Sequence, residues 1–221
     1  DDRDDDDWDC EYPDPIVTQT ITIYDMSNPD KPKIASQLVI EDTSYNYNPF
    51  LRNGVLYFTT YEWVDNYDRG RYMLKRIDVS DPKNPKEMSS VNIPGWLYDI
   101  SEDGEMLYTI DYQHEEDGDG NWTYYNTFNV LKLKNDKAYL KAKMRFDGWL
   151  SSLILKGDYA YLQYHEENYD KANDTWDYKN LLVTLSVADY KDIKIVDELE
   201  LQPHGYIETE EAGYLWSRIG Y

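Results

Sequence analysis

Apolar and polar residues alternate along most of the chain, in short runs that glycine or Asp/Asn/Pro turns separate. Segments 50–63, 97–112, 150–164 and 206–221 each contain two such runs around a glycine. Alternation with a period of two is typical of β-strands, and glycine supplies the positive φ of a tight hairpin. Each segment therefore predicts a β-hairpin, and no segment predicts a helix.

Two further runs accompany each hairpin and predict a third and a fourth strand. The third-strand runs are 21–26, 74–79, 128–133 and 181–187, and the fourth-strand runs are 34–40, 87–93, 139–146 and 193–201. Segment 191–201 has the charge content of a helix, but its alternating Ile193 and Ile195 favour a strand. The unit is therefore four strands long.

Three sequence markers recur in the same order about 54 residues apart. An Asp-x-Ser-x-Pro turn occurs at 25–29 and 78–82, a hairpin glycine at 54, 104, 157 and 213, and a Gly-aromatic pair at 95, 148 and 205. Four antiparallel strands per repeat predict an all-β fold, a β-propeller with one four-stranded blade per unit. A sandwich or a meander barrel is the alternative, but neither requires the same turn chemistry at every fourth strand.

This register divides the chain into an acidic segment, 1–19, and propeller blades, 20–221. The blades are a half blade at 20–40, complete blades at 45–93, 96–146 and 150–201, and a half blade at 205–221. The two half blades can combine into a closed four-bladed ring, which removes open sheet edges. The alternative is an arc of a larger propeller, which the start at Asp1 and the Asp-rich opening favour.

The Asp-x-Ser-Asp-Pro-x-Asn-Pro run at 78–85, its copy at 25–32 and the Gly-containing hairpins resemble a known family. This is the secreted C-terminal β-propeller family of bacteria and archaea, which is similar to the LVIVD-type repeats of cell-surface proteins. The resemblance covers most of residues 20–221, strongly over the first two units and weakly over the last two. It implies a propeller in an exported protein, and it implies no catalytic residues.

The net charge of the chain limits the classes of partner that it can bind. Lys and Arg total 22 against 44 Asp and Glu, a net charge of −22, which argues against nucleic acid and anionic membrane surfaces. No apolar run approaches the roughly 20 residues of a membrane helix, so we expect no membrane insertion by this segment. Cys10 is the only cysteine, which excludes a disulfide framework within the chain.

Aromatic residues gather where a propeller would form one rim. By analogy with other propellers, the long connections 64–71, 114–126 and 165–179 share a face with the segments that lead into each first strand. Candidate ligand-contacting residues on this rim are Trp96, Trp149, Tyr206, Trp122 and Trp176. Loops on a rigid scaffold commonly carry binding residues. The alternative for the Gly-Trp positions is packing between blades.

One acidic loop has the spacing of a cation site. Asp117, Asp119 and Asn121 alternate with glycine, and with Glu116 they supply oxygen ligands suited to Ca²⁺. An EF-hand is excluded, because Trp122 replaces the turn glycine and Phe128 replaces the final Glu. The hypothesis is a looser calcium loop, and the alternative is a solvated acidic loop. Asn121 and Asn173 also begin Asn-x-Thr sequons, which predict glycosylation in an exported protein.

Nucleophile elbows, phosphate-binding glycine loops and His-Glu-x-x-His motifs are absent from the sequence. We therefore expect a non-enzymatic, extracellular or cell-surface binding scaffold. Its expected partners are a protein or glycan at the acidic loop face and the remainder of its own parent chain. The alternatives are a glycan hydrolase or lyase with a polar pocket near Asp99, Ser151, Ser152 and Glu208, or a structural component of a surface layer or fibre.

Overall fold

The computed structural model of the chain describes residues 18–40, 47–64, 69–116, 122–170 and 175–201. Within these ranges the backbone forms β-strands and turns, without a helix. The all-β class that the alternating pattern predicts is confirmed. No helix in this described part has the length and apolar character needed to cross a membrane.

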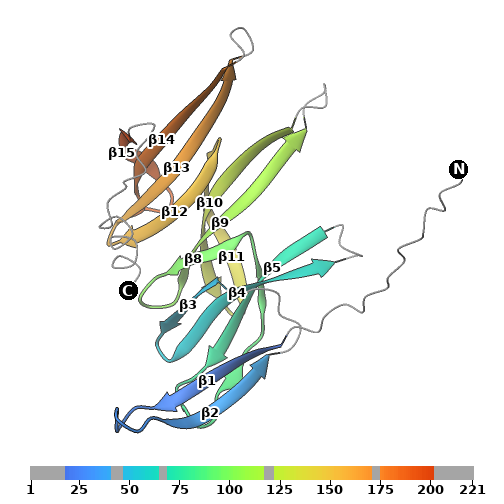
Figure 1. Cartoon of the computed structure of the whole chain (residues 1–221), viewed down its shortest axis with the longest axis vertical. Helices are drawn as coiled ribbons and strands as arrows, with labels where there is room; N and C mark the ends of the chain where they lie inside the picture. Colours follow the sequence, from blue (N-terminus) through green and yellow to red (C-terminus); the bar gives the residue numbers. More distant parts are fainter. Residues whose placement is uncertain (1–17, 41–46, 65–68, 117–121, 171–174, 202–221) are drawn as a thin grey trace, which may run out of the picture.

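The strands form antiparallel sheets that follow one another along the chain (Figure 1). The first sheet contains β1 (Gln19–Asp25) and β2 (Lys33–Ile40). The second contains β3 (Tyr47–Arg52), β4 (Val55–Val64), β5 (Arg69–Asp78), β6 (Lys86–Glu87) and β7 (Val91–Ile93). The third contains β8 (Trp96–Ile100), β9 (Met106–Glu116), β10 (Trp122–Lys134) and β11 (Lys137–Phe146). The fourth contains β12 (Trp149–Lys156), β13 (Tyr159–Asp170), β14 (Thr175–Ser186) and β15 (Lys194–Leu201).

The first strands of successive sheets lie beside one another. Strands β3, β8 and β12 begin the three predicted complete blades, and the predicted half blade at 205–221 lies outside the described residues. β3 contacts β8, and β8 contacts β12. Arg52 joins the first pair: its Nε donates to the carbonyl of Ile100 at 3.2 Å, and its Nη2 lies 3.4 Å from Oδ1 of Asp99. The sheets therefore succeed one another in space as they do in sequence.

The hairpin turns have the conformations that their residues predict. Asn53 and Gly54 have φ values of 49° and 75°, as a two-residue hairpin turn of type I′ requires. The N–H of Val79, at the end of the third strand, donates to the carbonyl of Gly54 at 2.8 Å. The third and fourth sheets repeat this bond from Leu133 to Glu105 and from Val187 to Asp158. The repeat in sequence is thus a repeat in structure.

The long connections predicted as acidic loops are mostly strand, which corrects the sequence analysis. Only 65–68 separates β4 from β5, 117–121 separates β9 from β10, and 171–174 separates β13 from β14. We call these hairpins the arms of the three sheets; they project beyond the shorter strands beside them (Figure 1). Opposite charges pair across them: Glu62 faces Arg71 in register, with Arg71 Nη2 2.9 Å from the carboxylate.

Three apolar cores separate the four sheets. Their buried members include Ile40, Phe58 and Ile77 between the first and second sheets; Leu74, Ile93, Leu97 and Leu107 between the second and third; and Phe128, Val130, Leu162, Val183 and Leu185 between the third and fourth. Phe58 and its neighbour Tyr57 belong to different cores, because successive side chains of a strand point to opposite faces. The second and third sheets are therefore apolar on both faces.

The Gly-aromatic marker has a steric cause. Gly95 has a φ of 75°, and a Cβ at this position would lie 2.1 Å from the carbonyl oxygen of Ile110 on β9. Gly148 has a φ of 154°, and its Cβ would lie 2.2 Å from the carbonyl oxygen of His165 on β13. Only glycine combines the positive φ with so close a backbone approach. Each glycine lets the chain pass against the second strand of the sheet that it is about to enter.

We expect Gly95→Ala and Gly148→Ala each to lower the free energy of unfolding by more than about 3 kcal/mol, because backbone strain and a backbone clash coincide. Gly157→Ala is the matched control. Its φ is 59°, but an added Cβ would meet no atom within 4 Å. Only the cost of the positive φ remains there, about 1 kcal/mol. Denaturant unfolding measures all three, and equal losses would contradict the steric explanation.

Candidate functional site

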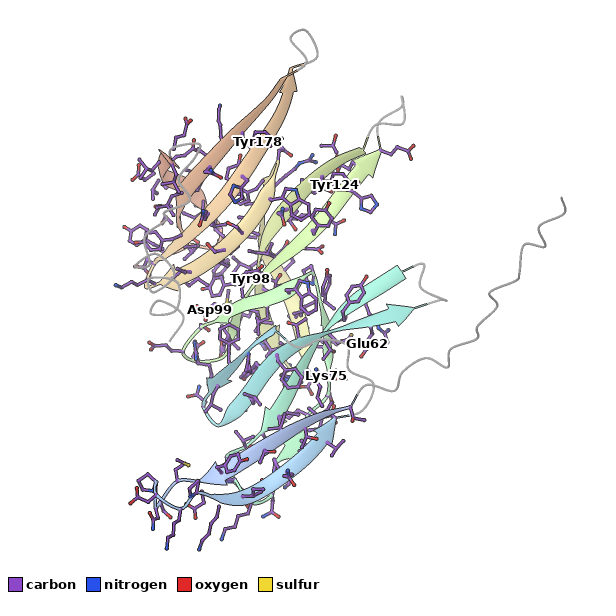
Figure 2. The ribbon with its side chains drawn as sticks, in the orientation of Figure 1. Glu62, Lys75, Tyr98, Asp99, Tyr124 and Tyr178 are labelled. Carbon is purple, nitrogen blue, oxygen red and sulfur yellow. The ribbon has the colours of Figure 1, made fainter. Side chains whose placement is uncertain are left out.

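Each arm has two chemically different faces. Along β9, Tyr112 and His114 alternate with Asp111, Gln113 and Glu115. Ile110, on the Tyr112 face, packs in the core shared with the fourth sheet, so this aromatic face looks toward the fourth sheet. The Asp111 face looks toward the second sheet. The same rule holds on the β4–β5 arm, where Glu62 and Lys75 lie on the face toward the first sheet (Figure 2).

The first aromatic cluster consists of Tyr61, Tyr72 and Trp96. Tyr61 and Tyr72 are cross-strand partners on β4 and β5, with ring centroids 5.0 Å apart at 62°. Trp96 begins β8 of the following sheet and reaches back to this pair, 5.1 Å from Tyr72 and 6.4 Å from Tyr61. Gly70 makes room for the cluster, because a Cβ there would lie 1.8 Å from the hydroxyl of Tyr61.

The second aromatic cluster repeats this arrangement one sheet further along. Trp149 begins β12 and stacks on Tyr112 of β9, with centroids 4.7 Å apart at 19°. Tyr112 in turn stacks on Tyr124 of β10 at 5.6 Å and 8°. Figure 2 labels Tyr124 on this arm. His114, the cross-strand partner of Tyr124, lies 6.2 Å from that ring. Three nearly parallel rings from three strands thus form one stack.

The two clusters differ in exposure. Trp149 is 49 % exposed, Tyr124 is 49 % exposed and Tyr112 is 36 % exposed, whereas Trp96 and both tyrosines of the first cluster are only partly exposed. The first cluster is therefore mainly a packing contact between sheets. The second leaves large aromatic surfaces in contact with solvent.

Polar groups accompany the aromatic faces. Gln113 donates a hydrogen bond to the carboxylate of Asp111, and Tyr164 donates one to Glu166, at the corresponding position of the fourth sheet. Burial raises the pKa of Asp111, and the bond from Gln113 opposes that rise. Burial also raises the pKa of Tyr72 to about 12, and the negative charge of Asp111 contributes to this rise. A carboxylate of the third sheet therefore lies close to the aromatic cluster of the second.

The structure brings together only part of the predicted rim. Trp96 and Trp149 lie in equivalent clusters between sheets, where Trp96 packs against Tyr72 and Trp149 both packs against Tyr112 and remains 49 % exposed. Trp122 and Trp176 lie in β10 and β14, with side chains outside the described part, and Tyr206 lies outside it altogether. Sequence reasoning missed the tyrosines of both clusters. Their signal is alternation within the arms, which the prediction of loops obscured.

The calcium hypothesis falls largely outside the described residues. Asp117, Asp119 and Asn121 lie outside them, as does the second sequon residue, Asn173. Glu116 ends β9 as an exposed residue paired in register with Trp122. Within the described part, His, Cys, Asp and Glu form no group of three or more arranged to hold a metal ion. The calcium loop and both glycosylation sites stay predictions.

The residues proposed for a channel pocket have other contacts. Asp99 accepts the backbone N–H of Ile100 at 2.7 Å and faces Arg52. Burial raises the pKa of Asp99, and these two neighbours oppose the rise. Ser151 donates to the carbonyl of Gln163 at 3.0 Å, and Glu208 lies outside the described residues.

Comparisons with protein-family models and with curated proteins give no match to this chain. The resemblance to the secreted C-terminal β-propeller family rests on the repeat motifs alone.

Tyr72 offers a direct test of the first cluster. In an alkaline titration, the Tyr72→Phe variant lacks the tyrosinate absorbance of Tyr72. We expect the difference between the wild type and this variant to have its midpoint near pH 12, not near the ordinary pKa of 10. Because the pKa of Tyr72 is higher in the folded state than in the unfolded state, the contribution of the neutral phenol to the free energy of unfolding is fully present below pH 10. This contribution is lost as the pH rises toward 12. Ultraviolet difference titration of the wild type and the variant measures this. A difference centred near pH 10 would mean that the phenol is solvated.

Proposed function

We propose that the chain is a β-propeller scaffold of an extracellular or cell-surface protein that binds its ligand on the arms. The support for the propeller is the succession of face-packed, four-stranded antiparallel units with adjacent first strands. The support for export is the repeat motif described above. The binding role rests on a single observation, the half-exposed stack of Trp149, Tyr112 and Tyr124.

A stack of aromatic rings exposed to water is unfavourable in free energy unless a ligand covers it. Scattered apolar residues are normal on a protein surface, but three stacked rings form a continuous patch. The rings also hold each other in place, so little conformational entropy remains to be lost when a ligand binds. The stack is therefore a preorganised platform.

A glycan is the ligand class that this platform fits best. One face of a pyranose ring is lined with C–H groups, which pack on an aromatic ring, while its hydroxyls need polar partners at the edge. Tyr112, Tyr124 and Trp149 supply the aromatic surface, and His114 lies beside it. The net charge of −22 favours a neutral glycan over an acidic one. A protein partner at the same arms is the alternative occupant.

We expect Trp149→Ala and Tyr124→Ala each to weaken binding of a neutral polysaccharide roughly tenfold, about 1.4 kcal/mol, which is the scale of one lost aromatic contact. Affinity electrophoresis in gels containing a panel of neutral polysaccharides measures the retention. Tyr159→Ala is the matched control, because Tyr159 is 45 % exposed at the opposite end of its strand from the arm tip. If no polysaccharide retards the wild type, or if Tyr159→Ala loses retention equally, the proposal is wrong.

Among the described residues the first sheet lacks the partner strands that the other sheets have, and this supports a proposal that the propeller closes into a ring. In the other sheets the third strand lies between the second and the fourth, but β1 pairs only with β2 among the described residues. Tyr24, Ile34 and Val39, on the face of the first sheet away from the second, are each 55 % exposed. Residues 205–221 carry the first-strand and second-strand markers that this sheet lacks. We propose that 213–221 adds to β1.

The register of the second sheet makes this closure testable. In that sheet Phe58, four residues after Gly54, pairs in register with Lys75, three residues before Asp78. The equivalent residues in the closed ring are Ser217, four residues after Gly213, and Thr22, three residues before Asp25. We expect Thr22→Cys with Ser217→Cys to form an intramolecular disulfide under mild oxidation in a Cys10→Ser background. Gln37→Cys with Ser217→Cys is the control, since Gln37 lies one strand further out. Absence of the first cross-link, detected by mass spectrometry, would favour an arc of a larger propeller.

A further inference from the structure

The third sheet departs from the repeat at the turn between its third and fourth strands. In the other sheets this turn contains an Asn or Asp, at 28, 81 and 189, whose carbonyl accepts the N–H three residues later. In the third sheet Asn135 and Asp136 form a two-residue turn with φ values of 51° and 57°. The positions that correspond to Asp78 and Ser80 are Lys132 and Lys134, as the shared bond from Val79 and Leu133 shows.

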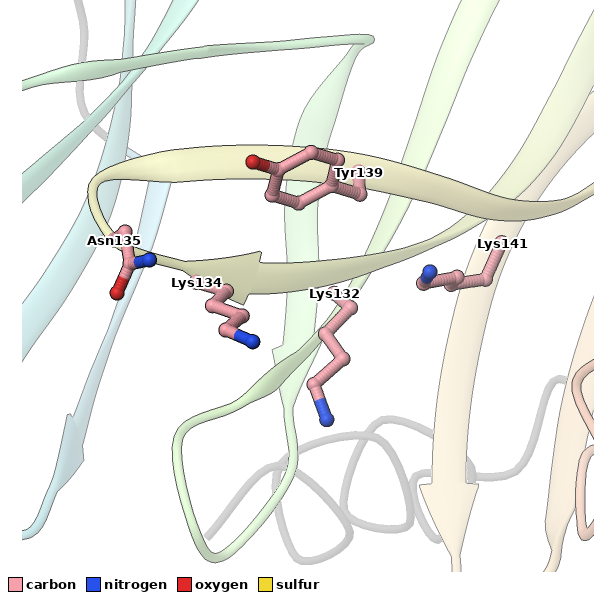
Figure 3. A pocket seen from close by; sticks show the side chains of 5 residues that line it. All are labelled: Lys132, Lys134, Asn135, Tyr139 and Lys141. Carbon is pink, nitrogen blue, oxygen red and sulfur yellow. The ribbon is translucent and has the colours of Figure 1, made fainter.

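This departure creates a basic hollow. Lys132 and Lys134 of β10, Asn135 of the turn, and Tyr139 and Lys141 of β11 line a surface hollow of about 440 Å³ (Figure 3). Tyr139 and Lys132 are cross-strand partners, which places them on one face. Nζ of Lys141 lies 6.0 Å from the ring centre of Tyr139. Three ammonium groups thus border one hollow on a protein with a net charge of −22.

Carboxylates compensate only part of the cationic charge of this region, where Arg145 pairs with Glu115 and Asp147. Residues 132–145 contain six of the 22 Lys and Arg residues and only one acid, Asp136. Asp136 accepts from Arg76 of the second sheet at 2.6 Å, and Lys132 lies 3.0 Å from Glu105. Among the described residues, no carboxylate lies within 4 Å of the ammonium of Lys134 or Lys141.

Protection of a sheet edge accounts for only one of these three lysines. Lysine on an outermost strand discourages edge-to-edge aggregation, and Lys141 on β11 fits that role. Lys132 and Lys134 lie on β10, which is paired on both sides, by β9 and β11. Their side chains share the face of Val130, which packs against the fourth sheet. Lys132 and Lys134 therefore face the neighbouring sheet and not the open edge.

We propose that this hollow binds a compact, multiply charged oxyanion, such as a phosphate ester or a polycarboxylate. Three ammonium groups and an amide supply donors for several oxygens, and the Tyr139 ring supplies a surface for an attached organic group. A compact anion is favoured over a polyanion because charges are screened beyond about 8–10 Å at physiological salt. A small ligand experiences mainly the local lysines, whereas a long polyanion also meets the acidic remainder of the surface. This site is separate from the aromatic stack.

Calorimetric titration at low ionic strength tests the proposal with inorganic phosphate and with citrate, which distinguish the two sources of oxyanion. We expect Lys134→Gln with Lys141→Gln to weaken binding at least roughly tenfold, since each charged hydrogen bond contributes on this scale. Lys31→Gln with Lys33→Gln makes the same charge change in and beside β2, and should leave binding unchanged.

Three outcomes would overturn the proposal. Neither anion binds the wild type; both double variants weaken binding equally, which would reflect net charge alone; or long-chain polyphosphate binds while phosphate and citrate do not. Denaturant unfolding of both variants separates lost binding from lost folding, and we expect it to be unchanged because Lys134 and Lys141 are exposed.

Discussion

Burial of both faces of every inner sheet is the constraint on which the rest of the structure depends. A strand such as β4 carries Phe58 toward one core and Tyr57 toward the other, so its sheet needs a neighbour on each side. Stacking the sheets in chain order satisfies this need with short connections. The connections must then turn closely against the next sheet, which is why glycine stands at 95 and 148.

The arms carry polar and exposed aromatic side chains because they extend beyond the packed cores. Near the first strands, side chains on both faces are fixed by the cores, and substitution there costs stability. Further along β9, side chains such as Tyr112 and Glu115 are exposed, so these positions are not required to be apolar. Trp96 and Trp149 bridge the two regions, since each begins one sheet and rests on the arm of the sheet before it. The contacts between sheets thus extend onto the arms through these two residues.

Local sequence patterns predicted most of the strands and turns. The contacts between residues far apart in the chain could not be predicted from such patterns. The hairpin glycines and the first strands were predictable because turn chemistry and alternation act over a few residues. The prediction of loops in place of the arms was wrong, because acidic residues obscured the alternation in segments such as 165–179. In the structure, Glu166 and Lys179 of this segment are cross-strand partners. The tyrosine stack depends on the register between β9 and β10 and on a tryptophan from another sheet. With 23 tyrosines in the chain, nothing local distinguishes Tyr112 and Tyr124.

The two-faced arm has a consequence for how such a protein can diversify. The β9–β10 arm lends Tyr112 and Tyr124 to its junction with the fourth sheet, and Asp111 to its junction with the second. Because alternate side chains separate these contributions, a substitution at one position alters one junction and spares the other. Each junction is therefore composed of side chains from two units, and each unit can be substituted on one face without a change to its other junction. Insertion of one additional unit would create a new combination of surfaces without redesign of those already present.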